Sequence, residues 1–438
     1  MSMSCKARIW GIYIAFLLLL SGVILVFSGY AEYGANKFSF KADNKTGEIT
    51  ERISRLYIGV NMSEMKNTLE SAAKFVMSVA WDNKYGGYYM IFNSTGPVDP
   101  RKFLFSIPWG IMSYGLLYNL TGDFVYLRWA YMIYETIDKF NYSGYYYPIF
   151  SENFSTPSIP HAGYSEYGLN TLYALVQTIY GLIVFYNITG NSTILAKATE
   201  LWLYVNNTFW DDVYGGLHGL SDVGLYMKAP ATISIFIYDS YLLYDILGND
   251  YYLNMLLKNV DALEKMWRNG FYHSYRDNYT IYNNFRFSPE IVFFYPSIAY
   301  VVAYLVTGNS TYYNRASTLI EYAYDEDWDD TYAGFYYNLD SDYNIWDNKK
   351  QTVSHATSIL MHTVFTGIFN ITLGQNHTDQ MFEVIKVLIK SLNETQYLPA
   401  DFNRTWGLTT NEGRSRTTLN TIASFLFFIK DYDNVAPI

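Results

Sequence analysis

The sequence has almost no cysteine and few charged residues, and both shortages limit what the protein can be. Cys5 is the only cysteine, so disulfides within the chain and zinc–thiolate sites are excluded. Charged residues make up 16% of the chain, the net charge is −10, and Lys and Arg form no basic stripe. Because nucleic-acid backbones are bound by clustered Lys and Arg, we expect no nucleic-acid partner.

Sequence motifs that indicate a bound cofactor or a catalytic nucleophile are also missing. The sequence contains no H-E-x-x-H, no G-x-S-x-G, no P-loop and no dinucleotide-binding fingerprint, and its six histidines are scattered. We therefore expect no metal site and no cofactor. What the sequence does have is tyrosine, with 46 residues. These rings suit both core packing and stacking on sugars.

The N-terminus has the features of a membrane anchor. Lys6 and Arg8 precede an uncharged run over residues 9–30. As a helix this run is about 33 Å long, enough to cross a bilayer, and it exceeds the apolar core of a cleaved signal peptide. We expect a cytoplasmic basic segment (1–8), an uncleaved transmembrane signal anchor (9–30) and a polar spacer (31–60). The large domain (61–432) then lies outside the cell; cleavage after residue 30 is the alternative.

Asparagine usage agrees with an extracellular domain. Fifteen asparagines begin an N-x-[ST] sequon, roughly three times the number expected by chance. We expect glycosylation at these positions, which are Asn44, Asn61, Asn93, Asn119, Asn141, Asn153, Asn187, Asn191, Asn206, Asn278, Asn309, Asn370, Asn376, Asn393 and Asn403. Together with the anchor, the sequons predict a single-pass protein of the cell membrane with possible neighbours in the cell envelope.

Two short phrases recur along the chain and alternate. One is a turn such as "LTGDF" (120–124), "ITGNS" (188–192), "LGNDY" (247–251) and "VTGNS" (306–310). Its Gly suits a left-handed helix end, and the Asp, Asn or Ser that follows suits the cap of the next helix. The other, here called the Trp-Asp motif, is "WDNKYGGYY" (81–89), "WDDVYGGLH" (210–218) and "WDDTYAGFY" (328–336). With three weaker phrases that join Gly to aromatic residues, the chain has six phrases of this second kind.

Twelve apolar-periodic segments lie between these phrases and form six pairs. The first segment of each pair covers 62–80, 124–140, 193–208, 250–266, 311–326 or 378–392. The second segment covers 103–119, 165–187, 231–247, 289–306, 353–371 or 412–430. The second segments are apolar all round, which predicts buried helices, whereas the first are amphipathic. The sequence therefore predicts an all-α domain of six helical hairpins, arranged as an (α/α)6 toroid behind the transmembrane helix.

The pattern "TGD..YL..A" followed by "W-D-x-x-Y-G-G-[FY]-Y" resembles the six-hairpin glycosidase superfamily and the N-acylglucosamine 2-epimerase-like proteins, over about residues 55–432. The resemblance implies closure of the toroid at six hairpins and a site at the N-terminal ends of the inner helices. The segment "IPWGIMSYGLLYNLTGDFVYLRWA", with "GYSEYGLN" further on, also resembles glucuronyl C5-epimerases.

The Trp-Asp motif itself is expected to be scaffold. A repeat distributes its acids around a ring, whereas an active site collects them in one place. We therefore interpret Asp82, Asp211 and Asp329 as turn and capping residues.

Candidate site residues lie in the long loops that lead into the second helices, because long loops on a rigid scaffold carry function. Glu166 and Glu290 open such helices and are our candidates for catalytic carboxylates, although a capping role is the alternative. His355 is the third catalytic candidate, with buried packing as its alternative. Candidates for substrate binding are Trp109, His161, Tyr164, Arg286, Trp346, Trp406, Glu412 and Arg414.

Three functions fit these residues. The first is an extracellular glycoside hydrolase acting on glycans, in which Glu166 and Glu290 form an acid–base pair. The second is a sugar (uronyl) epimerase or lyase, which needs an acid and a base on opposite faces of the sugar, from Tyr164, His355 and the arginines. The third is a non-catalytic glycan-binding or cell-envelope protein, since fold does not fix function.

Overall fold

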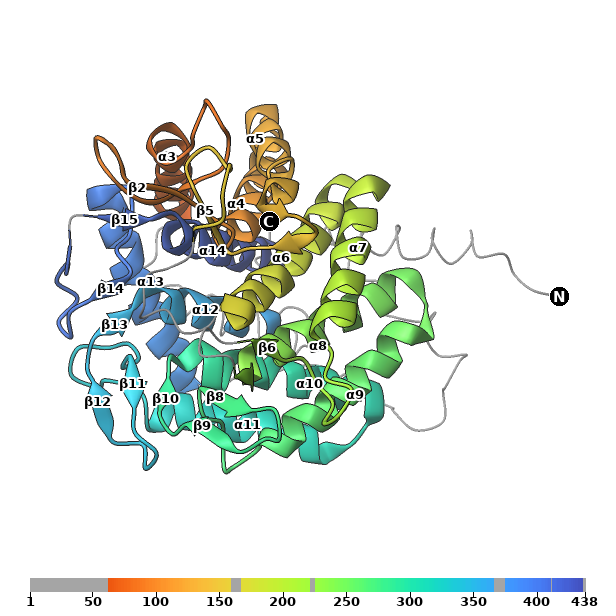
Figure 1. Cartoon of the computed structure of the whole chain (residues 1–438). Coiled ribbons are helices and arrows are strands. Elements are labelled where there is room, and N and C mark those ends of the chain that lie inside the picture. Colours follow the sequence, from red (N-terminus) through yellow and green to blue (C-terminus); the bar gives the residue numbers. More distant parts are fainter. Residues whose placement is uncertain (1–61, 159–166, 221–224, 366–374, 411, 436–438) are drawn as a thin grey trace. The chain divides into compact units, whose positions relative to one another are not determined.

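The computed structural model describes residues 62–158, 167–220, 225–365, 375–410 and 412–435 (Figure 1). The expected basic segment, transmembrane anchor and spacer lie outside these ranges. Residues 63–427 make up one compact unit, and this unit holds all the site residues discussed below.

The described ranges contain twelve α-helices in two sets of six. The first set is α3 (Met62–Val79), α5 (Phe124–Tyr134), α7 (Ser192–Phe209), α9 (Asp250–Met266), α11 (Ser310–Asp325) and α13 (Gln375–Thr395). The second set is α4 (Ser106–Thr121), α6 (Tyr167–Thr189), α8 (Pro230–Leu247), α10 (Tyr295–Thr307), α12 (Thr352–Thr363) and α14 (Ser415–Val435). All twelve predicted segments are helical, with most ends within three residues. The largest difference within the described ranges is at 124–140, where α5 stops at Tyr134 and a 3-10 turn, η1 (Ile137–Phe140), follows. Helix α12 ends at Thr363, and the predicted end at 371 lies outside the described residues. Helix α10 begins only at Tyr295, and α14 runs on to Val435.

The second set forms the inner layer. Helices α4, α6, α8 and α10 contact one another in chain order, and each also packs on the outer helix that follows it. A π-helical turn, η2 (Glu290–Phe294), begins α10 and contacts α12. The ring closes between its last and first members, because Ser415 Oγ lies 2.6 Å from Ser106 Oγ and Ser113 Oγ donates to Leu419 O (2.8 Å).

The inner helices are apolar because they are covered on every side. Two stretches, Gly168–Thr189 of α6 and Glu290–Thr307 of η2 and α10, are long and apolar enough to cross a membrane. However, 83% and 72% of their most apolar windows are buried inside the fold, so both belong to its core.

The turns between inner and outer helices have the predicted chemistry. Gly122, Gly190, Gly248 and Gly308 all have φ between 64° and 71°, the left-handed conformation that glycine adopts without strain. The next residue caps the following helix: the side chains of Asp123, Asn191, Asn249 and Asn309 each accept from the amide two residues on, at 2.9–3.0 Å.

The long loops form short antiparallel strands, which the helical patterns did not predict. One sheet has the order β15 (Gly413–Arg414), β1 (Tyr89–Asn93), β2 (Gly96–Phe103), β5 (Ile149–Phe150). Another has the order β6 (Gly219–Leu220), β7 (Tyr226–Lys228), β8 (Ser274–Arg276), β9 (Ile281–Asn283). The smaller ones are β10 (Arg286–Phe287), β11 (Asn338–Leu339) and β12 (Ile345–Asp347); β13 (Lys350–Gln351) with β14 (Asp401–Phe402); and β3 (Asn141–Tyr142) with β4 (Tyr145–Tyr146). Four of these sheets join strands from different loops, and the β3–β4 hairpin stays within one loop.

Candidate functional site

The three Trp-Asp motifs fold in the same way and are scaffold, as predicted. In each motif the amides two and three residues after the Asp donate to its Oδ1, at 2.8–3.3 Å. The two residues after the Tyr have positive φ, 78° and 78°, 82° and 78°, and 57° and 89° in chain order. Asp82, Asp211 and Asp329 are therefore turn residues.

A buried lysine completes each motif, which the sequence did not reveal. Lys102, Lys228 and Lys350 are fully buried and donate to the Oδ2 of the motif Asp at 2.7, 2.5 and 3.1 Å. Each lysine comes from the strand that precedes an inner helix. Burial alone would raise the pKa of Asp82, but Lys102 and the two amides outweigh it, so this pKa is lowered. The Asp–Lys pairs thus pin the long loops to the ends of the inner helices.

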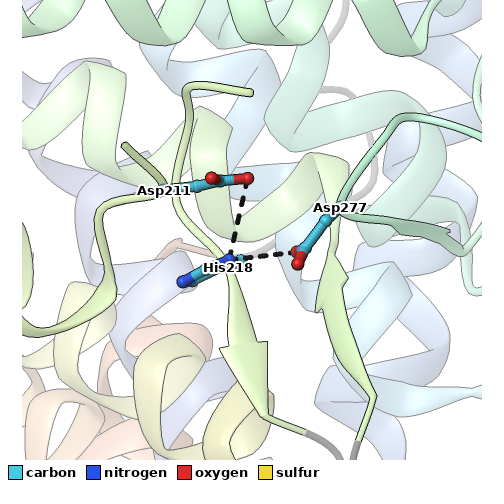
Figure 2. Close-up of side chains that lie close together, drawn as sticks. All are labelled: Asp211, His218 and Asp277. Carbon is cyan, nitrogen blue, oxygen red and sulfur yellow. Dashed lines mark hydrogen bonds and ion pairs between the residues drawn. The ribbon is translucent and has the colours of Figure 1, made fainter. Parts of the chain in front are cut away.

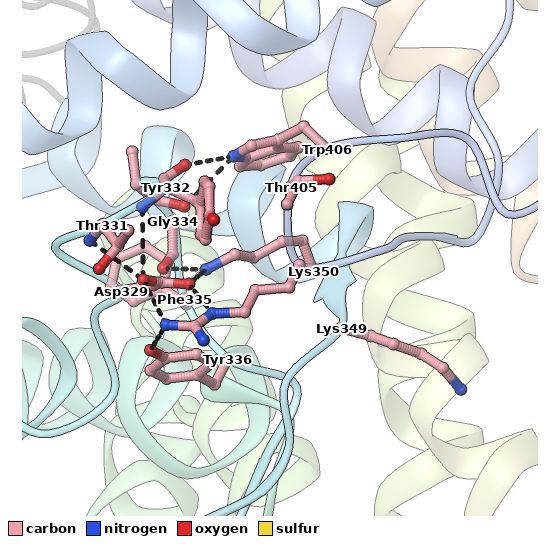
Figure 3. Close-up of polar contacts among 12 residues, drawn as sticks. Asp329, Thr331, Tyr332, Gly334, Phe335, Tyr336, Lys349, Lys350, Thr405 and Trp406 are labelled. Carbon is pink, nitrogen blue, oxygen red and sulfur yellow. Dashed lines mark hydrogen bonds and ion pairs between the residues drawn. The ribbon is translucent and has the colours of Figure 1, made fainter.

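The third Trp-Asp motif, at residues 328–336, holds two of the predicted site residues, Trp406 and His355, in structural roles. Arg404 donates to Asp329 through Nε (2.8 Å) beside Lys350. The indole N–H of Trp406 donates to Tyr332 O (2.8 Å), a contact visible in Figure 3. The scaffold therefore uses the indole N–H of Trp406. This contact does not support the prediction that the ring stacks on sugar.

His355 is also a structural residue. Its Nε2 accepts from the amide of Phe335 (2.8 Å), and its Nδ1 lies 2.6 Å from Gln351 O, to which it donates. Burial lowers the pKa of His355 to about 3, so the ring is neutral. Because the backbone uses both nitrogens, neither can take a proton from a substrate. These contacts favour the buried-packing alternative for His355 over the catalytic one.

Glu290, by contrast, is a buried carboxyl with neutral partners. It begins η2, is 3% exposed and contacts the Ser354 hydroxyl on α12. With its amide nitrogen turned toward Glu290, Gln351 also donates to both carboxyl oxygens at 3.3 Å. Burial raises the pKa of Glu290, and the contact with Ser354 and the more distant Arg416 only partly offset this. A carboxyl whose pKa is raised by burial is suited to act as a general acid.

Polar and aromatic side chains from three inner helices lie near Glu290. Tyr173 of α6 and Tyr295 of α10 meet edge to face, with ring centroids 6.4 Å apart, and Gln177 Nε2 donates to the Tyr295 hydroxyl (3.4 Å). The Arg416 guanidinium of α14 lies 5.6 Å from the centre of the Tyr173 ring. We call Glu290, Tyr173, Tyr295, Gln177 and Arg416 the central cluster.

The central cluster has hydrogen-bonding capacity that the protein does not use. Gln177 Oε1 and Arg416 Nε are buried and have no hydrogen-bond partner among the described residues. Buried polar groups are normally paired. Tyr173 and Arg416 are themselves partly exposed, so a polar ligand that entered here would find unpaired groups to bind.

Two acids near Glu290 escaped the sequence analysis. Asp401, on β14, is partly exposed, and its charge acts to raise the pKa of Glu290. Asp327 is 1% exposed, and burial, with a contribution from Glu290, raises its pKa well above the usual range. Aligning the Trp-Asp motifs would have revealed Asp327, because Ala80 and Phe209 take its position before the Trp in the other two.

The remaining predicted binding residues are scattered. Arg286 is buried between the rings of Tyr272 and Tyr343, 4.5 and 4.1 Å from their centres, and donates to Phe271 O (2.8 Å), so it is a packing residue. Trp109 is 1% exposed in α4, whereas Trp346 is 59% exposed on β12.

Among the described residues, one other predicted binding residue lies close to Asp401. Arg414 lies on β15 near Asp401. Burial raises the pKa of Asp401, and Arg414 partly offsets this. Glu412 is partly exposed beside it. Glu166, His161 and Tyr164 lie outside the described residues.

Twelve sequon asparagines fall in the described ranges; Asn44, Asn61 and Asn370 do not. Nine are exposed and two, Asn93 and Asn191, are partly exposed. Asn206 is 7% exposed, and its Nδ2, the atom that would carry a glycan, donates to the Tyr251 hydroxyl (3.0 Å). The folded protein therefore has no room for a glycan at Asn206.

Solved structures share this fold. A cellobiose 2-epimerase of Bacillus thermoamylovorans superposes with a TM-score of 0.66 at 13% identity, over 83% of this chain and 98% of that one. A D-mannose isomerase gives 0.65 at 15% identity, over 83% and 97%. A GH76 α-mannanase of Bacteroides thetaiotaomicron gives 0.64 at 12% identity, over 87% and 98%. The chain therefore shares the helical toroid fold of these proteins, as the sequence pattern predicts.

Comparison of sequences adds one curated relative. A cellobiose 2-epimerase of Ruminococcus albus is 27% identical over 176 residues, which is 38% of this chain and 44% of that protein. The match thus spans less than half of the relative's length. No protein-family model matches the chain.

Proposed function

We propose that this protein is a glycoside hydrolase that acts on glycans outside the cell, with Glu290 as its general acid. The observation that carries the proposal is the burial of Glu290 among neutral partners at the start of an inner helix. Burial raises the pKa of a carboxyl at such a site, which favours the protonated form that the acid of a glycosidase needs. The α-mannanase neighbour supports this chemistry on the same fold.

We assign the second carboxylate to Asp401. It is partly exposed, so water reaches it. Burial raises the pKa of Asp401, and the nearby Arg414 partly offsets this. In an inverting hydrolysis Asp401 removes a proton from water and the water oxygen bonds to the anomeric carbon. Glu290 gives its proton to the departing glycosidic oxygen as the carbon–oxygen bond breaks. Glu166 remains the alternative partner that the sequence suggests.

The central cluster supports binding of a sugar at this place. Tyr173 offers a partly exposed ring, and the unpaired Gln177 Oε1 can accept from a sugar hydroxyl. Arg416 has an unpaired N–H that can donate to a hydroxyl or to an acidic substituent. Because a site built to pair such groups discriminates against ligands that lack them, these residues would set the substrate's orientation.

A sugar epimerase or isomerase is the second candidate, and one observation favours it. Tyr173 and Tyr295 place two phenol groups beside Arg416, and phenols serve as acid and base in proton transfer at a sugar carbon. The cellobiose 2-epimerase relative supports the same candidate.

We also propose that residues 9–30 anchor the protein in the cell membrane with the toroid outside. The uncharged run behind Lys6 and Arg8 and the excess of sequons support this location. Protease treatment of intact cells tests it: removal of the toroid agrees with an outside domain, and full protection contradicts it.

The full-length protein, incubated with a panel of polysaccharides in heavy water, tests the reaction. We expect shorter chains with new reducing ends. Chains of unchanged length that carry one non-exchangeable deuterium would overturn the hydrolase in favour of the epimerase. Binding without any change would contradict both.

A further inference from the structure

The Trp-Asp motif at residues 210–218 differs from the other two at one position. Tyr89 and Tyr336 hold the ninth position in the other motifs, where the ammonium groups of Lys102 and Lys350 lie 3.9 and 4.6 Å from the ring centres. At 210–218 this position is His218. The motif therefore folds with a tyrosine at this position, and the needs of the fold do not explain the histidine.

His218 is oriented by an acid from the next long loop. Its Nδ1 lies 3.0 Å from Asp277 Oδ1 and 3.7 Å from Asp211 Oδ2. An Nδ1–H that donates to Asp277 leaves Nε2 as the basic nitrogen. Nε2 has no hydrogen-bond partner in the part of the chain that the structure describes. Figure 2 shows it pointing away from both acids, and the side chain is 17% exposed.

An exposed aromatic ring lies against this histidine. Tyr226 of β7 stacks on His218 with ring centroids 4.5 Å apart and is 49% exposed. The next residue after the histidine, Gly219, touches the start of inner helix α6: a Cβ at this position would lie 2.4 Å from the Leu169 nitrogen. Tyr173 of the central cluster is one helical turn further along α6.

We propose that His218, held by Asp277, forms with Tyr226 a rim subsite that binds one sugar unit of the glycan. His218 Nε2 accepts from a sugar hydroxyl, and Tyr226 offers apolar ring surface to the pyranose. A partly exposed ring beside an unpaired, oriented hydrogen-bonding group is the usual make-up of a sugar subsite. The assignment of glycan as the ligand rests on the proposed function.

A metal site is the competing interpretation of this cluster. One ligand atom each from Asp211, His218 and Asp277 lies within 4.8 Å of the others. However, Lys228 Nζ is 2.5 Å from Asp211 Oδ2 and 3.6 Å from Asp277 Oδ1. The ammonium already offsets part of the acids' charge, and a divalent ion beside it would be repelled. We therefore favour the sugar.

The variant His218→Tyr tests the proposal with little risk to the fold, because it restores the residue of the other two motifs. The substrates are oligosaccharides of increasing length, prepared from the polysaccharide that the protein cleaves. We expect KM for long oligosaccharides to rise about fivefold or more, with kcat within twofold of wild type. KM for the shortest cleaved substrate should not change. Tyr226→Ala should behave alike, whereas Tyr282→Ala, an exposed tyrosine of the same sheet, should have no effect.

The outcomes separate this proposal from the proposed function. If the wild-type protein cleaves glycans and His218→Tyr has the same KM at every length, the rim subsite is wrong and the hydrolase stands. If no glycan is cleaved, calorimetric titration with oligosaccharides prepared from each polysaccharide of the panel still tests the subsite, because His218→Tyr must weaken the binding that wild type shows. Equal binding by both proteins would overturn it. Loss of activity with a chelator, restored by a divalent metal in wild type but not in His218→Tyr, would replace it with a metal site.

Discussion

Replacing the motif lysines should destabilise the protein unequally. Asp82 is 3% exposed, and within the described ranges Lys102 is the one side-chain cation that forms an ion pair with it, at 2.7 Å. Removing one partner of a buried ion pair typically costs about 3–5 kcal/mol, and we expect this for Lys102→Met. Asp329 differs because Arg404 holds it together with Lys350. Lys350→Met leaves Asp329 with a cation and should cost less.

Urea unfolding of the two variants measures this difference. Each side chain is fully buried and methionine has a similar length, so packing changes alike and the ionic difference remains. Adding Arg404→Met to Lys350→Met should remove the protection and bring the cost up to that of Lys102→Met. Equal losses from the two single variants would refute the reasoning, because the number of cations around each Asp would then not matter.

Three further predictions follow from buried groups. Glu290→Gln should lower kcat by about 10²–10⁴ without loss of fold. In wild type, activity should fall as pH rises through the raised pKa of Glu290. A basic limb of the pH–activity profile that is unchanged in Glu290→Asp would count against the role of Glu290. Asp239 is fully buried with both oxygens unpaired, and burial raises its pKa. The stability that this shift contributes is present below the unfolded pKa of about 3.9 and is lost as pH rises through the folded pKa. Asp239→Asn should therefore unfold at higher urea than wild type at pH 8 but not at pH 4. An identical pH dependence of the two proteins would contradict this. Gly219→Ala places a Cβ against Leu169 and should cost about 1–3 kcal/mol; wild-type stability by the same urea assay would show that β6 does not approach α6 so closely.

Helices and turns were predictable from sequence because local patterns determine them. A Gly followed by Asp or Asn marks a helix end and a cap regardless of what lies elsewhere, and Gly122 with Asp123 folds accordingly. Apolar residues on all sides likewise mark an inner helix such as α8. The loop strands were not predictable, since segments of two or three residues pair only because the helices bring them together.

The site was less predictable because its contacts join distant parts of the chain. Glu290 was found because it opens an inner helix, but its partner Ser354 is 64 residues away. Arg286 and Trp406 have residue types common in sugar sites, and only the structure shows that backbone carbonyls occupy them. Lys102 looked like any surface lysine, although it is fully buried.

A comparison of leaving groups tests the role of Glu290 most directly. A glycoside with a strongly acidic phenol as leaving group needs no proton from the enzyme, whereas a natural glycan does. If Glu290 is the general acid, Glu290→Gln should retain most of the activity on the activated glycoside and lose that on the glycan. Equal losses on both substrates would contradict the account, because Glu290 would then act in some way other than protonating the departing oxygen.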